Sequence, residues 1–274
     1  MPLVLEPLPN GPAAPRSIDL GGVVPDRISG MSVADVAALT ITADGRPCRV
    51  GDLFAVTGDT SDATIECRGN FARVHFVAAG IQAGTVRVHG HVGRHAGEGM
   101  SGGRLEVSGD AGDWLAAQIA GGHVVVAGNA GHNVAAALPG EPLGGRGGVV
   151  LVGGSAGDLA AARLRRGVVA VAGDCGSGAA FEMRAGTLAV GGRLGPQPGL
   201  GMRRGSVLCL TDRPSPAATF RRGTAWRPTF VPLLFQWLRQ CGFGPADAAL
   251  AVPSWRQWHG DALAGGRGEL LHPA

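Results

Sequence analysis

Residues 85–93, Thr85-Val-Arg-Val-His-Gly-His-Val-Gly, open a phrase of 19 residues that recurs along the middle of the chain. The second and fourth residues of the phrase are apolar, and a corner with two glycines follows them. Its six occurrences start at Thr85, Arg104, His123, Val149, Val168 and Thr187, with a seven-residue insertion before the fourth. A fixed short period of this kind predicts an all-β fold, specifically a right-handed parallel β-helix with about 19 residues in each coil.

Three sets of apolar residues are predicted to face the interior of these coils. The first set comprises the second and fourth residues of each phrase, because alternate residues of a half-buried strand point inward. The second lies between the corner glycines, and the third lies three residues before each closing glycine. They consist of Val86, Val88, Leu105, Val107, Val124, Val126, Val150, Val152, Val169, Val171, Leu188 and Val190; of Val92, Ala111, Ala130, Ala156, Cys175 and Leu194; and of Ile81, Met100, Ile119, Leu164, Met183, Met202 and Phe220.

Composition narrows the class of protein. The 274 residues include 48 glycines, which the repeat accounts for, and the net charge of +3 gives no reason to expect nucleic acid as a partner. No apolar run is long enough to span a bilayer, and no signal-peptide pattern is present. The five cysteines are scattered and form no CxxC pair. We therefore expect a cytoplasmic protein with reduced thiols and no metal site.

The repeat divides the chain into three expected units. Residues 1–63 lie outside it and are predicted to form a small β-rich cap, since an open end of stacked coils would expose unpaired strand edges. Residues 64–223 are assigned to the β-helix. Residues 224–274 are expected to contain a helix from Phe230 to Phe243 and a tail, both packed on the β-helix, with Pro232 in the first turn of the helix.

One outward-facing column explains why that helix is needed. It reads Arg87, Glu106, Val125, Leu151, Ala170, Ala189 and Leu208, and so becomes apolar from the third coil onward. An apolar stripe on the outside of a protein is normally covered. The predicted cover is the C-terminal helix, through Leu233, Leu234, Phe235, Trp237 and Leu238; an external partner is the alternative.

A second outward column is basic. Two residues before each closing glycine the sequence has Arg146, Arg165, Arg184, Arg203 and, if the last coil is one residue shorter, Arg221. Stacked coils would place these side chains about 5 Å apart. Guanidinium groups keep their proton and repel one another, so an anionic partner is expected beside them. Two interpretations stay open: the arginines bind carbonyls or acidic residues of this chain or a neighbour, or they form a binding strip for an extended polyanion.

Motifs that carry chemistry are missing from the sequence. The histidines never adopt HxH or HExxH spacing, and the corner glycines recur in every coil outside any strand–loop–helix context, so they are not a phosphate loop. Aspartates at corners, such as Asp110 and Asp158, are typical turn caps. No catalytic residue and no metal ligand is therefore assigned, and no catalysis is expected from this chain alone.

Several stretches resemble a known family. They are Gly109-Asp-Ala-Gly-Asp-Trp, Ile119-Ala-Gly-Gly-His-Val-Val-Val-Ala-Gly-Asn-Ala-Gly and Arg165-Arg-Gly-Val-Val-Ala-Val-Ala-Gly-Asp-Cys-Gly. They are similar to the glutamate synthase C-terminal β-helix (GXGXG domain) and, more narrowly, to the C subunit of formylmethanofuran dehydrogenase and of the related bacterial formyltransferase/hydrolase complex. The tail motif Gly265-Gly-Arg-Gly-Glu-Leu-Leu favours the C subunit and extends the resemblance over nearly the whole chain.

The resemblance implies a component of a complex in one-carbon metabolism that acts on formyl groups attached to a methanofuran-type carrier. Its implied partners are amidohydrolase-like, formyltransferase-like and molybdopterin-dehydrogenase-like subunits, which would perform the catalysis. Such complexes are oxidoreductases in methanogens and formyltransferase/hydrolases in methylotrophic bacteria; the arginine-rich, lysine-free composition favours the second. Because the carrier has a glutamate-containing tail, Arg146, Arg165, Arg184, Arg203 and Arg221 form a hypothetical cofactor-binding strip for polyglutamate.

Two other functions remain as alternatives. One is a freestanding β-helical enzyme with a surface-groove site, as in polysaccharide lyases, although such sites need clustered charged residues where the strand face here is apolar. The other is a regulatory module like that of glutamate synthase, which the C-terminal tail disfavours. Copurifying partners and an inert isolated chain would separate the complex subunit from the freestanding enzyme.

Overall fold

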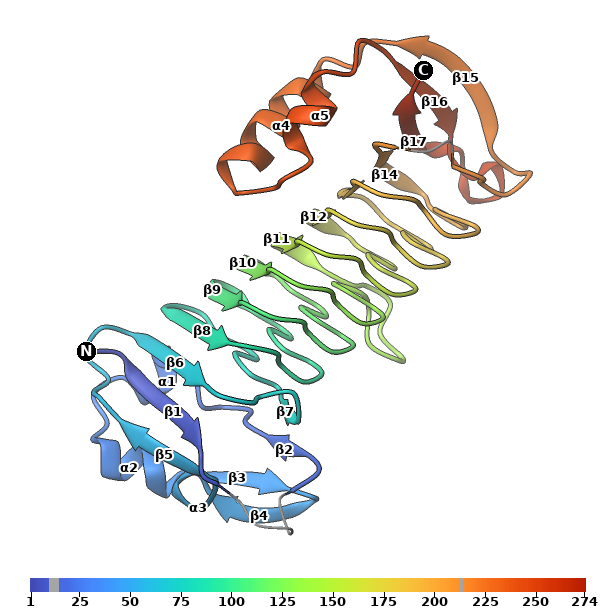
Figure 1. Ribbon diagram of the computed structural model, residues 1–274. Helices are drawn as coiled ribbons and strands as arrows, with labels where there is room; N and C mark the ends of the chain where they lie inside the picture. The colour runs from blue at the N-terminus through green and yellow to red at the C-terminus, as the bar shows by residue number, and fades with distance from the viewer. Residues whose placement is uncertain (10–14, 212–213) are drawn as a thin grey trace.

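The 19-residue repeat folds into a ladder of parallel strands, which Figure 1 shows as successive turns of chain stacked along one direction. The computed structural model describes residues 1–9, 15–211 and 214–274. The strands are β1 (Leu3–Pro7), β2 (Ile18–Asp19), β3 (Thr40–Ala43), β4 (Arg46–Arg49), β5 (Phe54–Thr57), β6 (Thr64–Arg68), β7 (Val74–His75), β8 (Thr85–His89), β9 (Ser101–Val107), β10 (Gly121–Val126), β11 (Arg146–Val152), β12 (Arg166–Val171), β13 (Thr187–Val190), β14 (Arg204–Cys209), β15 (Arg221–Trp226), β16 (Trp255–His259) and β17 (Arg267–Pro273). The helices are α1 (Pro25–Ile28), α2 (Val33–Ala38), α3 (Val50–Leu53), α4 (Phe230–Gln240), α5 (Ala246–Leu250) and the 3₁₀ turn η1 (Ala262–Ala264).

These strands form two sheets. The larger has 13 strands in the order β15-β16-β17-β14-β13-β12-β11-β10-β9-β8-β6-β1-β5 and is mostly parallel; the smaller has four, in the order β4-β3-β2-β7. The prediction of a mainly β protein is therefore confirmed. None of the described helices is long and apolar enough to cross a bilayer.

Register in the large sheet follows the repeat. Leu105 pairs with Val86 on one side and with Val124 on the other, and Val124 in turn pairs with Val150. The last pairing spans 26 residues, because the insertion leaves the sheet as a loop between β10 and β11. The predicted pairing of equivalent residues in neighbouring coils is confirmed.

The predicted inward columns form the core. All but one of the first two sets, and every member of the third, are buried; the exception, Leu194, is partly buried and packs against the core cluster. Isolated parallel bridges link the corner column from Phe71 through Val92 to Leu194. In the third column the insertion puts Gly145 where other coils have a large apolar residue, and a Cβ added there would lie 2.8 Å from Leu164 Cδ1. Leu164 therefore fills the space that the missing side chain leaves.

Each coil also contains left-handed residues that are not glycine. In one coil Trp114, Ala116 and Gln118 have φ angles of 63°, 53° and 55°. A side chain in this region is strained unless surrounding bonds hold it. Here they do: the Ala116 N–H donates to Ala96 O of one neighbouring coil, and the Gln118 N–H donates to Ala136 O of the other, at 2.8 and 3.1 Å. Stacking, rather than local propensity, fixes this backbone.

The C-terminal helices cover the apolar stripe on the outside. Leu151, Ala170, Ala189 and Leu208 are buried in one cluster with residues of α4 and α5. The buried residues of α4 are Val231, Phe235 and Leu238, whereas Leu233 is 67% exposed. The prediction of an intramolecular cover is confirmed, but Leu233 faces solvent and takes no part in it.

The two ends of the ladder are closed by chain from outside the repeat. At the N-terminal end β1 lies between β6, to which it is parallel, and β5, to which it is antiparallel. α2 begins at a capping box in which Ser32 and Asp35 bond reciprocally. At the C-terminal end β17 pairs in parallel with β14, and β16 and β15 extend the sheet in antiparallel fashion. The tail is therefore part of the large sheet.

Candidate functional site

Four of the five arginines expected in a row occupy equivalent positions on successive coils. The backbone N–H groups of Arg146, Arg165, Arg184 and Arg203 donate to Ile119 O, Gly145 O, Leu164 O and Met183 O of the preceding coils, at 2.6–2.8 Å. Arg146, Arg165 and Arg203 are exposed, and Arg184 is partly buried. The coils thus bring the four positions together along one corner, as the period predicts.

Arg221 does not belong to this row. It opens β15 and pairs with His259 of β16, two strands beyond β14. The place next to Arg204 is taken instead by Arg267 of β17. The prediction failed because it assumed that the next segment in sequence continues the stack, whereas the tail returns and inserts β17 first. The strip is therefore completed by an arginine from the tail.

A basic pocket lies where the row meets the tail. Its volume is about 470 Å³, and it is lined by Arg165, Arg184, Ala185, Arg203, Arg204, Ala264, Gly265 and Arg267. Arg146, at the far end of the row, is not part of its lining. Five guanidinium groups around one space make a strongly positive site.

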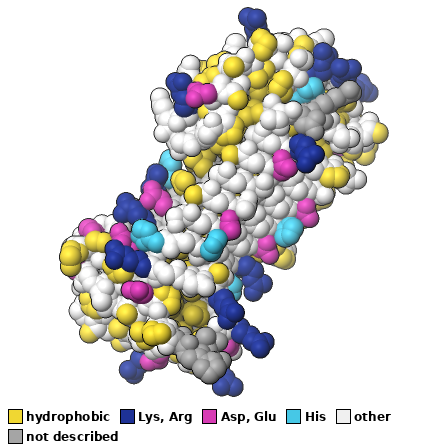
Figure 2. Space-filling view, in the orientation of Figure 1, with side chains coloured by type: hydrophobic (Ala, Val, Ile, Leu, Met, Phe, Trp, Pro, Cys, Tyr) yellow, Lys and Arg dark blue, Asp and Glu magenta, His cyan; other side chains and the backbone are white. Residues whose placement is uncertain are grey.

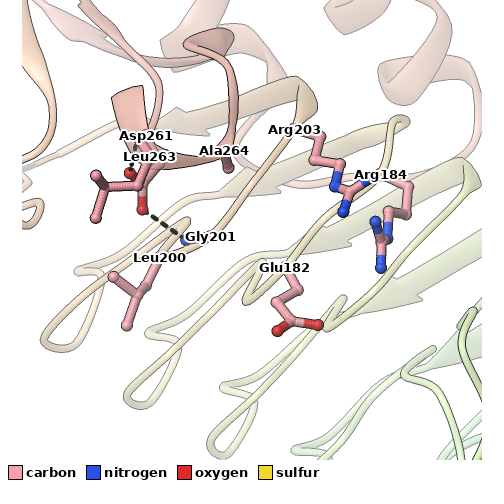
Figure 3. Close-up of a pocket in the computed structure, with 8 residues that line it drawn as sticks. All are labelled: Glu182, Arg184, Leu200, Gly201, Arg203, Asp261, Leu263 and Ala264. Atoms are coloured by element: carbon pink, nitrogen blue, oxygen red, sulfur yellow. Dashed lines mark hydrogen bonds between the residues drawn. The ribbon is translucent and has the colours of Figure 1, made fainter.

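A second pocket of about 340 Å³ adjoins the first and shares Arg184, Arg203 and Ala264 with it. Figure 3 shows the side chains of Arg184 and Arg203 on one side and the turn that carries Asp261, Leu263 and Ala264 on the other. Glu182 also lines this space, but its carboxylate is already paired with Arg163 at 2.9 Å. The acidic groups here leave the arginines of the row uncompensated.

The cations of the basic pocket have no internal counter-ion. Within residues 1–9, 15–211 and 214–274, none of Arg165, Arg184, Arg203, Arg204 and Arg267 forms a salt bridge, whereas Arg87, Arg104 and Arg163 do. The Nε of Arg184 is buried without a hydrogen-bond partner in that described part of the chain. A buried donor without a partner is costly, so an acceptor from outside the chain would stabilise this pocket.

Asp261 holds the far wall of the pocket in place. Its side chain is 2% exposed; Oδ2 accepts the Gly201 N–H at 2.9 Å, and Oδ1 accepts the Leu263 N–H at 2.9 Å. These bonds tie η1 to the last coil of the repeat. Sequence reasoning assigned no role to Asp261, although it lies in the tail that carries the family resemblance. A lone aspartate between Gly260 and Ala262 gives no other signal.

Other histidines and aspartates serve the corners of the coils. The Asp110 N–H donates to His91 Nδ1 at 3.0 Å, and Asp110 Oδ1 accepts the Asn129 N–H at 2.7 Å. Asn129 and Ser155 continue this ladder to the next two coils. Figure 2 shows the resulting row of histidine and acidic side chains along the body of the molecule. In the described part of the chain no group of three or more His, Cys, Asp or Glu side chains is arranged to hold a metal ion.

The fold and the pocket define a repeat protein that presents an extended basic surface along one corner of its coils. A comparison with solved structures finds one chain of the crystal structure of the formyltransferase/hydrolase complex (FhcABCD) from Methylorubrum extorquens in complex with methylofuran. The two chains have a TM-score of 0.90 and 34% sequence identity, over 99% of each.

A sequence comparison identifies which component of that complex the chain resembles. Residues of this chain are 36% identical, over 80 positions, to the C subunit of the formyltransferase/hydrolase complex Fhc of Methylorubrum extorquens. That alignment spans 29% of this chain and 30% of the relative. A scan against protein-family models finds no match. With the near-complete structural match, the chain belongs to the family of C subunits of the formyltransferase/hydrolase complex.

Proposed function

We propose that this chain is the non-catalytic structural subunit of a formyltransferase/hydrolase complex in one-carbon metabolism. The observation that carries the proposal is the match over 99% of both chains to the complex crystallised with methylofuran. The carrier handled by the whole complex is then of the methanofuran type. The transferase/hydrolase form is favoured over the dehydrogenase form, because both relatives are named for it.

The finer assignments follow from this proposal. The partners would be amidohydrolase-like, formyltransferase-like and molybdopterin-dehydrogenase-like subunits, and the complex would work in the cytoplasm, which suits five cysteines that are all free. The stacked coils are assigned to a right-handed parallel β-helix, supported by parallel pairing at intervals of 19 residues. Residues 1–63 serve as its cap, and residues 224–274 as its outer cover.

Purification of the tagged chain from its own cells tests the structural role. The expected result is a complex of fixed stoichiometry that transfers and hydrolyses formyl groups on a methanofuran-type carrier. The isolated chain is expected to be inactive. Formyl transfer by the isolated chain, or a fully assembled complex that lacks it, would contradict the proposal.

The basic strip is proposed to bind the anionic tail of the carrier. The supporting observations are the row of Arg165, Arg184 and Arg203 and the absence of carboxylate partners for them among the described residues. Carboxylates spaced along a polyglutamyl chain would form charge-assisted, often bidentate, hydrogen bonds with such a row. Arg267 replaces Arg221 as the tail's contribution.

Alanine at Arg165, Arg184 and Arg203 together tests the strip in the intact complex. Each exposed charge pair contributes about 0.5–1 kcal/mol, so the affinity for a polyglutamylated carrier should fall about 10- to 100-fold. A carrier with a single glutamate should bind almost as before. Arg193→Ala, on another corner beside Asp174, is the matched control and should change neither affinity. Equal affinities for the triple variant and the unaltered complex would exclude tail binding here.

A further inference from the structure

β15 is the least covered strand of the large sheet. Five of its six residues are exposed, and only Gly223 is partly buried. Trp226, at its C-terminal end, is 40% exposed. Strands in a packed sheet normally bury one face, and large aromatic side chains are seldom left in solvent. The exposure of β15 indicates a surface that is covered in the working assembly.

β15 is also an open edge. It pairs with β16 on one side, and among residues 1–9, 15–211 and 214–274 no strand pairs with its other side. Its backbone N–H and C=O groups on that side are free to extend the sheet. The remaining edges are less accessible: β4 contains Pro47, β7 has two residues, and β5 lies beside α2 and α3. Figure 1 shows β15 as the outermost strand at the C-terminal end.

Charge decides what the edge accepts. Arg221 and Arg222 lie on β15, Arg227 follows it directly, and Arg256 lies on β16; none of the four has a carboxylate partner in the described chain. Figure 2 shows arginine or lysine side chains gathered at this end of the molecule. A second copy of the same strand would bring arginine against arginine and be repelled. An acidic segment would be attracted.

An apolar pocket continues the edge. It has a volume of about 300 Å³ and is lined by Arg227, Pro228, Leu250, Pro253 and Trp255, among others. Trp255 pairs with Trp226, so the pocket lies at the C-terminal end of β15. An extended segment that runs along β15 can therefore place an apolar side chain in this pocket. A strand edge, unpaired arginines and an anchor pocket lie in one line.

From this arrangement we propose that β15 is the docking edge for an extended acidic segment of a partner protein. The segment adds a strand to the large sheet by main-chain hydrogen bonds, as in strand addition to other exposed sheet edges. Its carboxylates meet Arg221 and Arg222, and an apolar residue near one end enters the pocket beside Arg227. The carrier's anionic tail is a different occupant, because a γ-linked backbone does not match the spacing of a β-strand.

Hydrogen exchange and peptide binding on the full-length chain test this proposal. The probe is a peptide of 6 residues, the length of β15, that alternates glutamate with valine and ends in leucine. Binding is followed by Trp fluorescence, and the amides of β15 should exchange more slowly when the peptide is bound. The same peptide N-methylated at alternate residues along the pairing edge should not bind, because it lacks the main-chain donors.

Charge reversal locates the site without disturbing the core, since both arginines are exposed. The variant Arg221→Glu with Arg222→Glu should weaken the acidic peptide about 10-fold or more. Arg46→Glu, on the edge strand β4, is the matched control and should leave binding unchanged. Alanine at Arg165, Arg184 and Arg203 should also leave it unchanged, which keeps this test separate from that of the basic strip.

Several outcomes would overturn the proposal. Equal binding of the N-methylated peptide would exclude strand addition, and equal binding by the Arg221→Glu, Arg222→Glu variant would place the peptide elsewhere. Protection of β15 by a γ-linked glutamate oligomer as strong as by the peptide would assign this edge to the carrier's tail. Self-association of the unaltered chain through β15, seen by sedimentation and abolished by the charge reversal, would make a second copy the occupant.

Discussion

Phe235→Ala is the sharpest test of how the C-terminal helices are held. Phe235 is fully buried under α4, with its ring centroid 6.5 Å from that of Phe243 and 6.3 Å from that of Trp255. It lies in the cluster that covers Ala170, Ala189 and Leu208. Truncation would leave a cavity between α4, α5 and the outer face of the coils, because the stacked backbone beneath cannot move in to fill it.

The expected cost follows from this burial. Phenylalanine-to-alanine changes in cores lower the free energy of unfolding by about 3–5 kcal/mol. Leu233→Ala is the control on the same helix: Leu233 is 67% exposed, so its truncation should cost less than about 0.5 kcal/mol. The sequence alone placed both residues in the cover. The two variants therefore test the structure rather than the apolar pattern.

Hydrogen exchange of the α4 amides, with urea unfolding followed by Trp fluorescence, measures both costs. Exchange is needed because α4 can detach while the coils stay folded, and such local opening escapes a global transition. The Phe235→Ala chain should show faster exchange throughout α4 and unchanged exchange in β10 and β11. A loss below about 1 kcal/mol for Phe235→Ala would refute the packing argument, as would equal losses for the two variants.

Three further predictions concern the coils. Burial, with smaller effects from Arg94 and His95, lowers the pKa of His75, whose Nδ1 accepts the Arg94 N–H at 2.9 Å; stability should therefore fall as pH drops below the unfolded value of 6.5. His75→Asn keeps an acceptor, and denaturation at several pH values should show a flatter dependence; an unchanged dependence would exclude His75 as its source. Gly102→Ala would put a Cβ 2.0 Å from Gln82 O and should destabilise by several kcal/mol in urea unfolding, whereas Gly244→Ala, with open space around it, should be close to neutral. Burial raises the pKa of Cys67 and of Cys175 to about 12, so neither thiol should react with a thiol reagent in the native chain at neutral pH; rapid labelling of either would contradict their placement in the core.

The stack could be predicted because its information is local and repeated. One register shift would move Val86, Val88 and their equivalents out of the core in every coil, so the period fixes which residues are neighbours. The apolar stripe at Leu151 and Leu208 likewise demanded a cover, and α4 was the amphipathic segment closest in sequence. Burial patterns of this kind survive in sequence because many residues share them.

The left-handed residues could not be predicted. Trp114, Ala116 and Gln118 have side chains that disfavour positive φ, and the bonds that hold them come from neighbouring coils. The same holds for β1, which pairs in parallel with β6 although the whole N-terminal cap separates the two strands in sequence. In both cases the determining contacts are distant in sequence and occur without a repeated pattern.

The basic pocket shows the limit most clearly. Arg165, Arg184 and Arg203 were placed by the period, but the pocket is completed by Arg267 and by the turn that Asp261 ties to Gly201. Period arithmetic fails at the first segment that leaves the repeat, which is why Arg221 was placed in the wrong row.

The tail also connects the two proposed surfaces. β15 and β17 flank β16, and η1, which walls the pocket, lies between β16 and β17. A strand added to β15 would order the sheet that carries Arg267, because each strand of an antiparallel pair is held by the main-chain bonds of its neighbour. The segment from 221 to 273 therefore links a docking edge to an anion pocket through the main-chain hydrogen bonds of two strand pairs. A fully stacked sequence of 19-residue coils would have neither surface, since both arise where the chain leaves the repeat and returns to it.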